Sequence, residues 1–346
     1  MIDLSLINKH RKFLMGLAAF WIVVYHSSFF DFRDIEFLSV THIGDLLEIL
    51  KRLGNAAVEV FLFLSGIGLY YSMTKDSKLT SFYKKRFFRV VPSAFIIVVT
   101  LCGFLSTTYL PEYFSQITFV DLFIKSEVAE VAWYVSAILV FYLFFPLIYK
   151  AVKRFGLIAV IVISLVSIIF TFVLGIIDYD YFMRVEVFLT RIPAFVTGAY
   201  LGKIIMKGVK IPRWGFLAII LFNIVYTFLS VFLIIQIQED YGFIRHYINF
   251  PLALSFLFVF AFLREAVGSH IITRFFEMLG IFSLEYYLIH VNMYQYCLKF
   301  FNTDEESGLK YAITIIVVSF VLAVIVKSVA DKISGYLNPP KVEEKK

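Results

Sequence analysis

The sequence is poor in charged residues, and this is the first constraint on its class. Charged side chains make up 17% of the 346 residues, whereas hydrophobic residues make up 60% and aromatic residues 19%. Soluble domains average roughly 25% charged and roughly 45–50% apolar residues. The composition therefore excludes a water-soluble globule and a disordered chain. The net charge of +6, dispersed among 41 Phe and 21 Tyr, also excludes a nucleic-acid-binding surface.

Cysteine and linker sequences are scarce as well. Cys102 and Cys297 cannot build a disulfide framework or a zinc site, so we expect two buried thiols and no metal. No Pro-rich or Gly/Ser-rich stretch and no repeat divides the chain. We therefore expect one domain over residues 1–337, followed by a charged, disordered tail over residues 338–346.

Long apolar runs are abundant instead. An α-helix needs about 20 predominantly apolar residues to cross the hydrocarbon core of a bilayer. The sequence contains ten such runs, at residues 13–30, 54–73, 90–110, 131–149, 156–177, 187–206, 214–236, 246–263, 276–298 and 311–330. The first run is too long, and is followed by too many others, to be a cleaved signal peptide. The runs predict an all-α, polytopic integral membrane helix bundle with about ten transmembrane helices.

The charges between the runs predict the orientation of the chain in the membrane, because Lys and Arg accumulate in cytoplasmic loops. With the N-terminus in the cytoplasm, 23 of the 32 basic residues fall on the cytoplasmic side, and acidic residues gather in the outer loops. An error of one span would scramble this alternation. We therefore expect both termini, including the charged tail, in the cytoplasm.

Polar and ionisable residues inside the runs are the candidates for function, because a charge at the bilayer centre costs roughly 2.5–3.5 kcal/mol. An imidazole can take a proton from a hydroxyl at neutral pH, a carboxylate can orient it, and a guanidinium can stabilise an oxyanion. The alternative is a set of buried groups that pair to hold helices together. Because five runs bring such residues to a similar depth, we favour chemistry. These residues are His26, Glu59, Trp133, Tyr134, Ser136, Arg191, Glu285, Tyr287 and His290.

A basic cluster precedes the third run, where Lys84, Lys85, Arg86 and Arg89 follow one another closely. On a helix, Arg86 and Arg89 share a face. Two guanidinium groups in this arrangement suit the oxygens of a phosphate or pyrophosphate. A positive-inside signal in contact with anionic lipids, worth about 1 kcal/mol per basic residue, explains the cluster equally well.

Six segments carry a resemblance to a known family: GLAAFWIVVYHS, GNAAVEVFLFLSG, FYKKRFFRVVP, AWYVSAILVFYLFFP, RIPAFVTGAYLGK and LGIFSLEYYLIH. Their order resembles the acyltransferase 3 family, whose multi-pass membrane enzymes O-acylate cell-surface polysaccharides and related acceptors. The resemblance covers about residues 10–330. It implies that His26 is the essential histidine of the first span and that Arg86 and Arg89 form the R-x-x-R element associated with acyl-CoA. Further positions that match the family are Ser65, Gly66, Trp133 and His290.

Two positions depart from the family pattern. Members commonly carry a basic residue 11 positions before the histidine, where this chain has Met15. At 100° per residue, Lys12 and Arg11 project about 40° and about 60° from the face of His26, and we expect one of them to replace the missing cation. Members also often carry a Glu shortly after the tryptophan, whereas this chain reads WYVSAILV. Either Glu59 supplies the acid or the match is looser there.

Together, the residues and the resemblance imply a membrane O-acyltransferase, and in particular an O-acetyltransferase, with acyl-CoA as co-substrate and no tightly bound cofactor. We expect His26 to act as general base or transient acyl carrier, with Glu59 and Arg191 orienting it and stabilising the oxyanion. We expect the donor phosphates to bind Arg86, Arg89, Lys85 and Lys12. Expected substrate-binding or structural polar residues are Ser65, Trp133, Tyr134, Ser136, Glu285, Tyr287 and His290.

The resemblance also implies the setting, which is the plasma membrane of a bacterium. Expected partners are membrane lipids and a glycan or lipid-linked sugar that accepts the acyl group, with a homo-oligomer or polysaccharide-synthesis enzymes as further options and no nucleic acid. A transporter or flippase would also have ten spans and intramembrane polar residues, but the sequence shows no inverted repeat, and a transporter does not need paired arginines at its cytoplasmic entry. An inactive scaffold in an envelope assembly is a third alternative, which Met15 would permit.

Overall fold

The computed structural model describes residues 1–27, 31–35, 37, 41–102, 117–124, 133–236, 244–300 and 308–338. Apart from two short strands, the regular elements in these residues are helical, so the prediction of an all-α fold is confirmed. Cys297 is buried as expected, whereas the side chain of Cys102 and almost all of the predicted disordered tail lie outside the described residues.

The elements follow one another along the chain as a series of helices of very different lengths. The strands are β1 (Ile2–Asp3) and β2 (Lys210–Ile211). The helices before residue 130 are α1 (Ser5–Lys9), α2 (Arg11–His26), η1 (Phe32–Asp34), α4 (Ile43–Arg52), η2 (Leu53–Ala56), α5 (Ala57–Lys75), α6 (Leu79–Ile97), η3 (Val98–Cys102) and α9 (Asp121–Ile124). The later helices are α10 (Trp133–Phe155), α11 (Leu157–Ile177), α12 (Tyr179–Leu189), α13 (Ile192–Met206), α14 (Arg213–Gln236), α15 (Ile244–Val267), α16 (Ile271–Ile281), α17 (Ser283–Phe300) and α18 (Gly308–Leu337).

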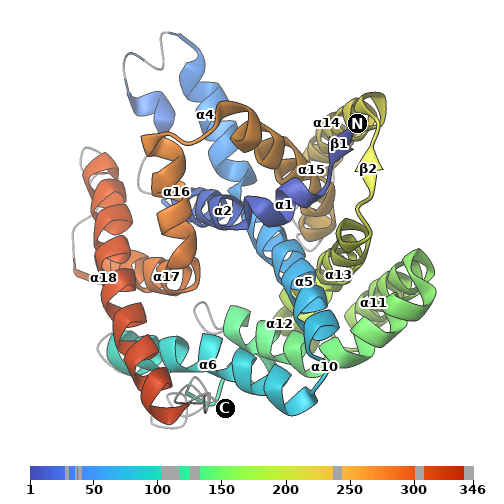
Figure 1. Ribbon diagram of the computed structural model, residues 1–346. Helices are drawn as coiled ribbons and strands as arrows, with labels where there is room; N and C mark the ends of the chain where they lie inside the picture. The colour runs from blue at the N-terminus through green and yellow to red at the C-terminus, as the bar shows by residue number, and fades with distance from the viewer. Residues whose placement is uncertain are drawn as a thin grey trace.

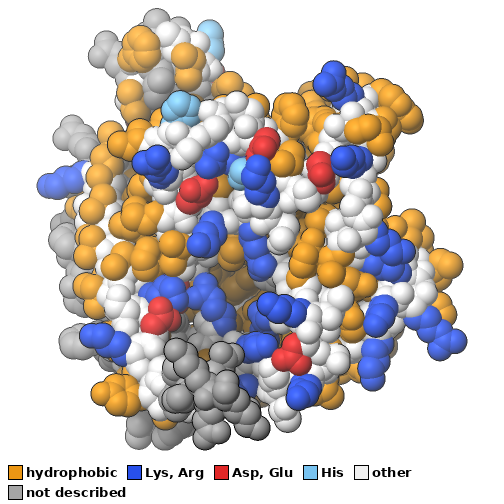
Figure 2. Space-filling view, viewed as in Figure 1, with side chains coloured by type: hydrophobic (Ala, Val, Ile, Leu, Met, Phe, Trp, Pro, Cys, Tyr) orange, Lys and Arg blue, Asp and Glu red, His pale blue; other side chains and the backbone are white. Residues whose placement is uncertain are grey.

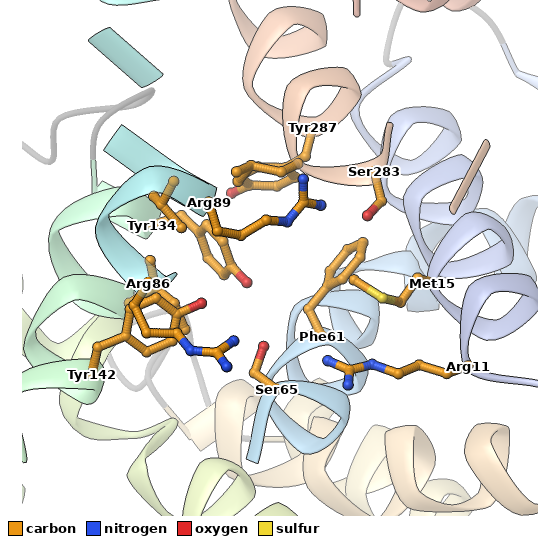
Figure 3. Close-up of a pocket in the computed structure, with 13 residues that line it drawn as sticks. Arg11, Met15, Phe61, Ser65, Arg86, Arg89, Tyr134, Tyr142, Ser283 and Tyr287 are labelled. Atoms are coloured by element: carbon orange, nitrogen blue, oxygen red, sulfur yellow. The ribbon is translucent and has the colours of Figure 1, made fainter. Parts of the chain in front are cut away.

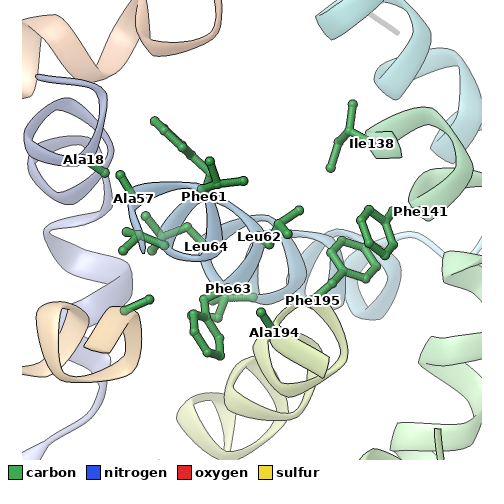
Figure 4. Close-up of a cluster of buried hydrophobic side chains, with 14 of the residues drawn as sticks. Ala18, Ala57, Phe61, Leu62, Phe63, Leu64, Ile138, Phe141, Ala194 and Phe195 are labelled. Atoms are coloured by element: carbon green, nitrogen blue, oxygen red, sulfur yellow. The ribbon is translucent and has the colours of Figure 1, made fainter. Parts of the chain in front are cut away.

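Helix α5 lies at the centre of the hydrophobic core (Figure 4). Its side chains at residues 61–64 are nearly or fully buried, because α2, α10 and α13 surround the helix. Phe195 of α13 stacks on Phe141 of α10 with the ring centroids 4.3 Å apart. In Figure 1, α2, α5, α10, α6, α18 and α17 form a ring around the centre of the molecule. The core therefore holds in place the helices that carry most of the candidate residues.

Glycines allow two pairs of helices to approach closely. A Cβ atom at Gly66 of α5 would lie 2.5 Å from the carbonyl oxygen of Phe195 in α13. A Cβ atom at Gly280 of α16 would lie 1.9 Å from the carbonyl oxygen of Lys12 in α2. Small residues at such crossings are typical of membrane helix pairs, because they bring the backbones into contact. These contacts fix the backbone of α5, which carries Glu59, against α13, and the backbone of α2, which carries His26, against α16.

Two of the expected spans are divided into two helices each. Residues 187–206 are shared between α12 and α13, which are separated at Arg191. Pro193, at the start of α13, has no amide hydrogen to continue a helix from α12. Residues 276–298 are shared between α16 and α17, and Figure 1 shows these two helices meeting at a steep angle. Phe282 leaves the helical conformation there, two residues after the Gly280 contact with α2.

Apolar helices cover much of the outer surface. In the described residues, five helical segments are long and apolar enough to cross a membrane, at residues 43–75, 133–155, 157–177, 246–267 and 308–337. The sequence predicted ten spans, but α2 and α13 have only 16 and 15 residues, and basic side chains occupy the first half of α6. Exposed apolar side chains, such as Ile176 (85% exposed) and Phe228 (74%), mark the surface that faces lipid.

Contacts join the N-terminus to connections that the charge pattern assigned to the same side of the membrane. Strand β1 pairs with β2, so the N-terminus lies against the connection between α13 and α14. Lys9 Nζ lies 2.8 Å from Glu265 at the end of α15. Lys203 Nζ at the end of α13 donates to the carbonyl of Val152 near the end of α10, at 2.8 Å. Figure 2 shows a face on which Lys and Arg gather around a central hollow.

Candidate functional site

A pocket lies among α2, α5, α6, α10 and α17, within the ring of helices (Figure 3). Three arginines, several aromatic and hydroxyl side chains, and a few aliphatic ones form its walls. No Asp or Glu is among the described lining residues. The lining residues are Arg11, Met15, Phe61, Ser65, Arg86, Arg89, Val90, Tyr134, Ile138, Tyr142, Ser283, Leu284 and Tyr287.

The three guanidinium groups make this pocket strongly positive. Arg86 and Arg89 reach it from one face of α6, and Arg11 reaches it from the first residue of α2 (Figure 3). Arg86 Nη2 donates to Ser72 Oγ at 2.9 Å, and Arg89 Nη1 lies 4.0 Å from Glu285 Oε1. Three guanidinium groups, with the carboxylate of Glu285 4.0 Å from one of them, suit a ligand that carries several negative charges, such as a diphosphate.

The absence of a side chain at Gly68 of α5 makes the space that Arg11 occupies. A Cβ atom at Gly68 would lie 1.9 Å from Arg11 Nη1. Arg11 precedes Met15 by four residues on the same face of α2, and both line the pocket. Lys12 is exposed and does not line it. The structure thus places Arg11, and not Lys12, in the lining of the pocket, and donor binding by Lys12 stays a prediction.

Glu285 lies behind Arg89 and is completely buried. Ser93 Oγ, two turns of α6 beyond Arg86, donates to Glu285 Oε1 at 2.6 Å. Among the described residues, Oε2 of the same carboxylate has no hydrogen-bond partner. The carboxylate thus supports Arg89 from the protein side and leaves its guanidinium directed into the pocket.

Aromatic side chains form the wall of the pocket opposite α2. Tyr134, Ile138 and Tyr142 follow one another at four-residue spacing along one face of α10. The rings of Tyr134 and Tyr287 lie 5.1 Å apart, and Phe61 contacts Tyr287 edge-on at 6.4 Å. This wall gives an elongated ligand an apolar surface beyond the arginines.

Glu59 and Arg191 form a buried ion pair beside this wall. Glu59 Oε1 lies 3.1 Å from Arg191 Nε, and the two side chains are 0% and 2% exposed. The guanidinium lies over the ring of Trp133 at 5.1 Å and donates to the carbonyl of Val187 at 2.7 Å. Ser136 is buried one turn beyond Trp133, outside the pocket lining. The structure thus gives Glu59 a partner in Arg191 rather than in His26.

His26 and His290 form a hydrogen-bonded pair of imidazoles at the end of α2. His26 Nδ1 and His290 Nε2 lie 2.9 Å apart. His26 is partly exposed, whereas His290 is fully buried. The ring of Tyr287, which lines the pocket, lies 5.5 Å from the ring of His290. A continuous series of side chains therefore joins the arginine pocket to His26.

Ser65, predicted as a substrate-binding or structural polar residue, and Lys85, predicted to bind the donor, lie in different settings. Ser65 lines the pocket near Arg11 and Arg86 (Figure 3). Lys85 is exposed and points away from it, and its Nζ lies 3.2 Å from the partly exposed Asp76. Hydrogen bonds from the Ser81 side chain, the Lys78 backbone and Lys85 lower the pKa of Asp76 to about 2. Lys85 is not among the residues that line the pocket, since adjacent residues on a helix face different ways, and donor binding by Lys85 stays a prediction.

One residue that lines the pocket and two that support its lining did not emerge from the sequence. Tyr142 was missed, although its spacing from Tyr134 and Ile138 is the signal of a shared helix face. Ser93 and Gly68 carry no such signal. Their importance depends on Glu285 and Arg11, which approach them from helices distant in the sequence.

The match to a family agrees with this geometry. The acyltransferase 3 family model, described as an acyltransferase domain, matches residues 13–328. The chain therefore belongs to the acyltransferase 3 family, as its six motifs predicted. No curated protein and no solved structure matches it. The family and the apolar helices together make it a membrane acyltransferase.

Proposed function

We propose that the protein is an O-acetyltransferase, which moves an acetyl group from cytoplasmic acetyl-CoA to a hydroxyl of an extracytoplasmic or lipid-linked glycan. The observation that best supports this proposal lies along α2. Arg11, in the pocket of three arginines, is its first residue, and His26 is its last. The rise of an α-helix separates them by about 22 Å. Acyl-CoA has a form that suits this distance, with a charged head and a reactive thioester at the end of a thin arm.

In the proposed reaction, the donor binds at one end of α2 and the acyl group is transferred at the other. The donor phosphates lie among Arg11, Arg86 and Arg89, and the thioester reaches His26. Nε2 of His26 takes the proton of the acceptor hydroxyl while the hydroxyl oxygen attacks the thioester carbonyl. The carbon–sulfur bond breaks, and the thiolate receives the proton from His26, which yields the ester and free CoA. A transient acyl group on His26 would give the same products in two transfers.

The proposal includes an orientation with both termini and the arginine pocket on the cytoplasmic side of a bacterial plasma membrane, with ten crossings. It is supported by the pairing of β1 with β2 and by the contact of Lys9 with Glu265, because these contacts join segments that the charge pattern placed on one side. The acceptor then approaches His26 from the outer side. The partners in this proposal are membrane lipids and the glycan, with polysaccharide-synthesis enzymes or a second copy as further candidates.

The test uses membranes that contain the overproduced protein and the native glycans of its source. They are incubated with acetyl-CoA labelled in the acetyl group, and alkali-labile label in the glycan fraction is measured. We expect His26→Ala to lower transfer at least about a hundredfold, as loss of a general base does. His42→Asn is the matched control, because His42 is 88% exposed and lies outside the site. Transfer that His26→Ala leaves undiminished, at equal protein level, would contradict the proposal.

A further inference from the structure

The two imidazoles at the end of α2 share one hydrogen between facing nitrogens. His26 Nδ1 and His290 Nε2 are 2.9 Å apart. A neutral imidazole carries hydrogen on one nitrogen and a lone pair on the other, so one ring donates and the other accepts. Which ring donates decides whether His26 can act as a base.

If His290 donates, Nδ1 of His26 uses its lone pair to accept, and its hydrogen must lie on Nε2. His26 then has no free lone pair with which to take a proton. If His26 donates through Nδ1, its Nε2 keeps the lone pair. Among the described residues, the side-chain partner of His26 lies at Nδ1, and the residue is partly exposed, so Nε2 is the nitrogen left for an acceptor hydroxyl.

The surroundings of His290 favour the second arrangement. His290 is fully buried, and the backbone carbonyls of Tyr286 and Tyr287, in the preceding turn of α17, lie beside its ring. Because Nε2 faces His26 and Nδ1 is the ring nitrogen nearer the backbone, Nδ1 is the nitrogen on the side of these carbonyls. Neither carbonyl meets the geometry of a hydrogen bond with this nitrogen. A lone pair on Nδ1 would nevertheless be repelled by the carbonyl oxygens, whereas a hydrogen there is attracted. With hydrogen on Nδ1, neutral His290 offers a lone pair at Nε2, and His26 must donate.

We propose that His290 is a positioning residue, which accepts the Nδ1 hydrogen of His26 and thereby keeps Nε2 of His26 free as the base. This inference rests on the proposed function of His26. His290 also stabilises the cation that forms when Nε2 takes the acceptor proton, because the hydrogen bond from Nδ1 then becomes charge-assisted. The role that a carboxylate has in a serine hydrolase triad belongs here to a neutral imidazole. Glu59 is paired with Arg191 and does not take this role.

The tautomer can be observed without any assay of activity. The protein, labelled with ¹⁵N in its six histidines, is studied in nanodiscs by magic-angle-spinning NMR, and the signals of His26 are identified by their loss in His26→Ala. We expect His26 to carry hydrogen on Nδ1 and to couple through it to Nε2 of His290. Hydrogen on Nε2 of His26 would overturn the inference.

Two substitutions at His290 separate hydrogen bonding from packing. Glutamine can place an oxygen near the position of Nε2 and accept from His26, whereas leucine fills similar space without an acceptor. In the transfer assay, we expect His290→Leu to lower kcat between roughly tenfold and roughly a thousandfold, with KM for acetyl-CoA unchanged. His290→Gln should recover most of this loss. A wild-type kcat in His290→Leu, or an equal loss in both variants, would overturn the inference.

The results also distinguish this inference from the function on which it rests. If His26→Ala abolishes transfer but His26 carries its hydrogen on Nε2, the proposed function stands and the role of His290 is wrong. If the tautomer is as expected but His26→Ala transfers normally, the proposed function fails instead. If His290→Leu does not fold, the NMR measurement on the wild-type protein still decides the question.

Discussion

Replacing Gly68 with alanine should displace Arg11 without removing any atom from the pocket. The new Cβ atom would lie 1.9 Å from Arg11 Nη1 and 2.6 Å from its Cζ, which is far closer than any van der Waals contact. These atoms are the end of a flexible side chain, so the guanidinium moves and the backbone of α5 stays. Alanine is also favoured over glycine inside a helix by about 1 kcal/mol. We therefore expect a folded protein with a displaced arginine.

The expected cost is that of one charge-assisted contact to the donor. Such contacts contribute about 1.5–3 kcal/mol, which corresponds to a Kd roughly 10- to 150-fold weaker. Binding of CoA to the purified protein in nanodiscs can be measured by calorimetry, with thermal unfolding as the check on folding. Arg11→Gln should weaken binding by a similar factor, and the double variant should be little worse than either single one.

Gly335→Ala is the matched control for this experiment. Gly335 also lies inside a helix, α18, and a Cβ atom there meets nothing within 4 Å. It should bind CoA like the wild type. A folded Gly68→Ala protein that binds CoA with wild-type affinity would refute the assignment of Arg11 to the donor site.

Three further predictions concern the ion pair, the helix crossing and the basic cluster. Glu59→Gln leaves the buried Arg191 without its counter-charge and should lower the free energy of unfolding by about 3–5 kcal/mol. Adding Arg191→Met should restore part of this stability. Equal melting temperatures for the wild type, Glu59→Gln and the double variant would contradict this prediction. Gly280→Ala drives a Cβ atom into a backbone carbonyl at 1.9 Å and should abolish monodisperse protein in size-exclusion chromatography, in contrast to Gly335→Ala. Lys85→Gln should leave the Kd for CoA within about threefold of wild type, because this exposed lysine pairs with the carboxylate of Asp76 outside the pocket. A loss of CoA affinity as large as that of Arg11→Gln would refute the placement of Lys85 outside the pocket.

The sequence predicted many of the helices because the length of a hydrophobic run is a local property. The helices α5, α10, α11 and α18 lie close to the expected runs. The breaks beside Arg191 and at Phe282 were not predicted, since hydropathy averaged over a run does not register where a helix changes direction. A proline two residues after Arg191 was the available signal for the first break.

The sequence identified the polar residues of the candidate site by their positions along the apolar runs, but it did not predict which of them contact one another. Glu59, Arg191 and His290 are buried in the helix bundle and His26 is partly buried, but a single sequence does not fix the rotation of one helix against another. The structure pairs Glu59 with Arg191 and His26 with His290. For the same reason, helical geometry alone placed Lys12 closer than Arg11 to the face of His26. The space at Gly68, on a different helix, is what admits Arg11 to the pocket.

The most direct test of the central claim is an experimental structure of the protein in nanodiscs with a non-hydrolysable acetyl-CoA analogue. We predict density for the phosphates among Arg11, Arg86 and Arg89, and for the acetyl group beside Nε2 of His26. Density for the phosphates elsewhere, for example on the exposed Lys84, or an acetyl group remote from His26, would contradict the assignment of both ends of α2.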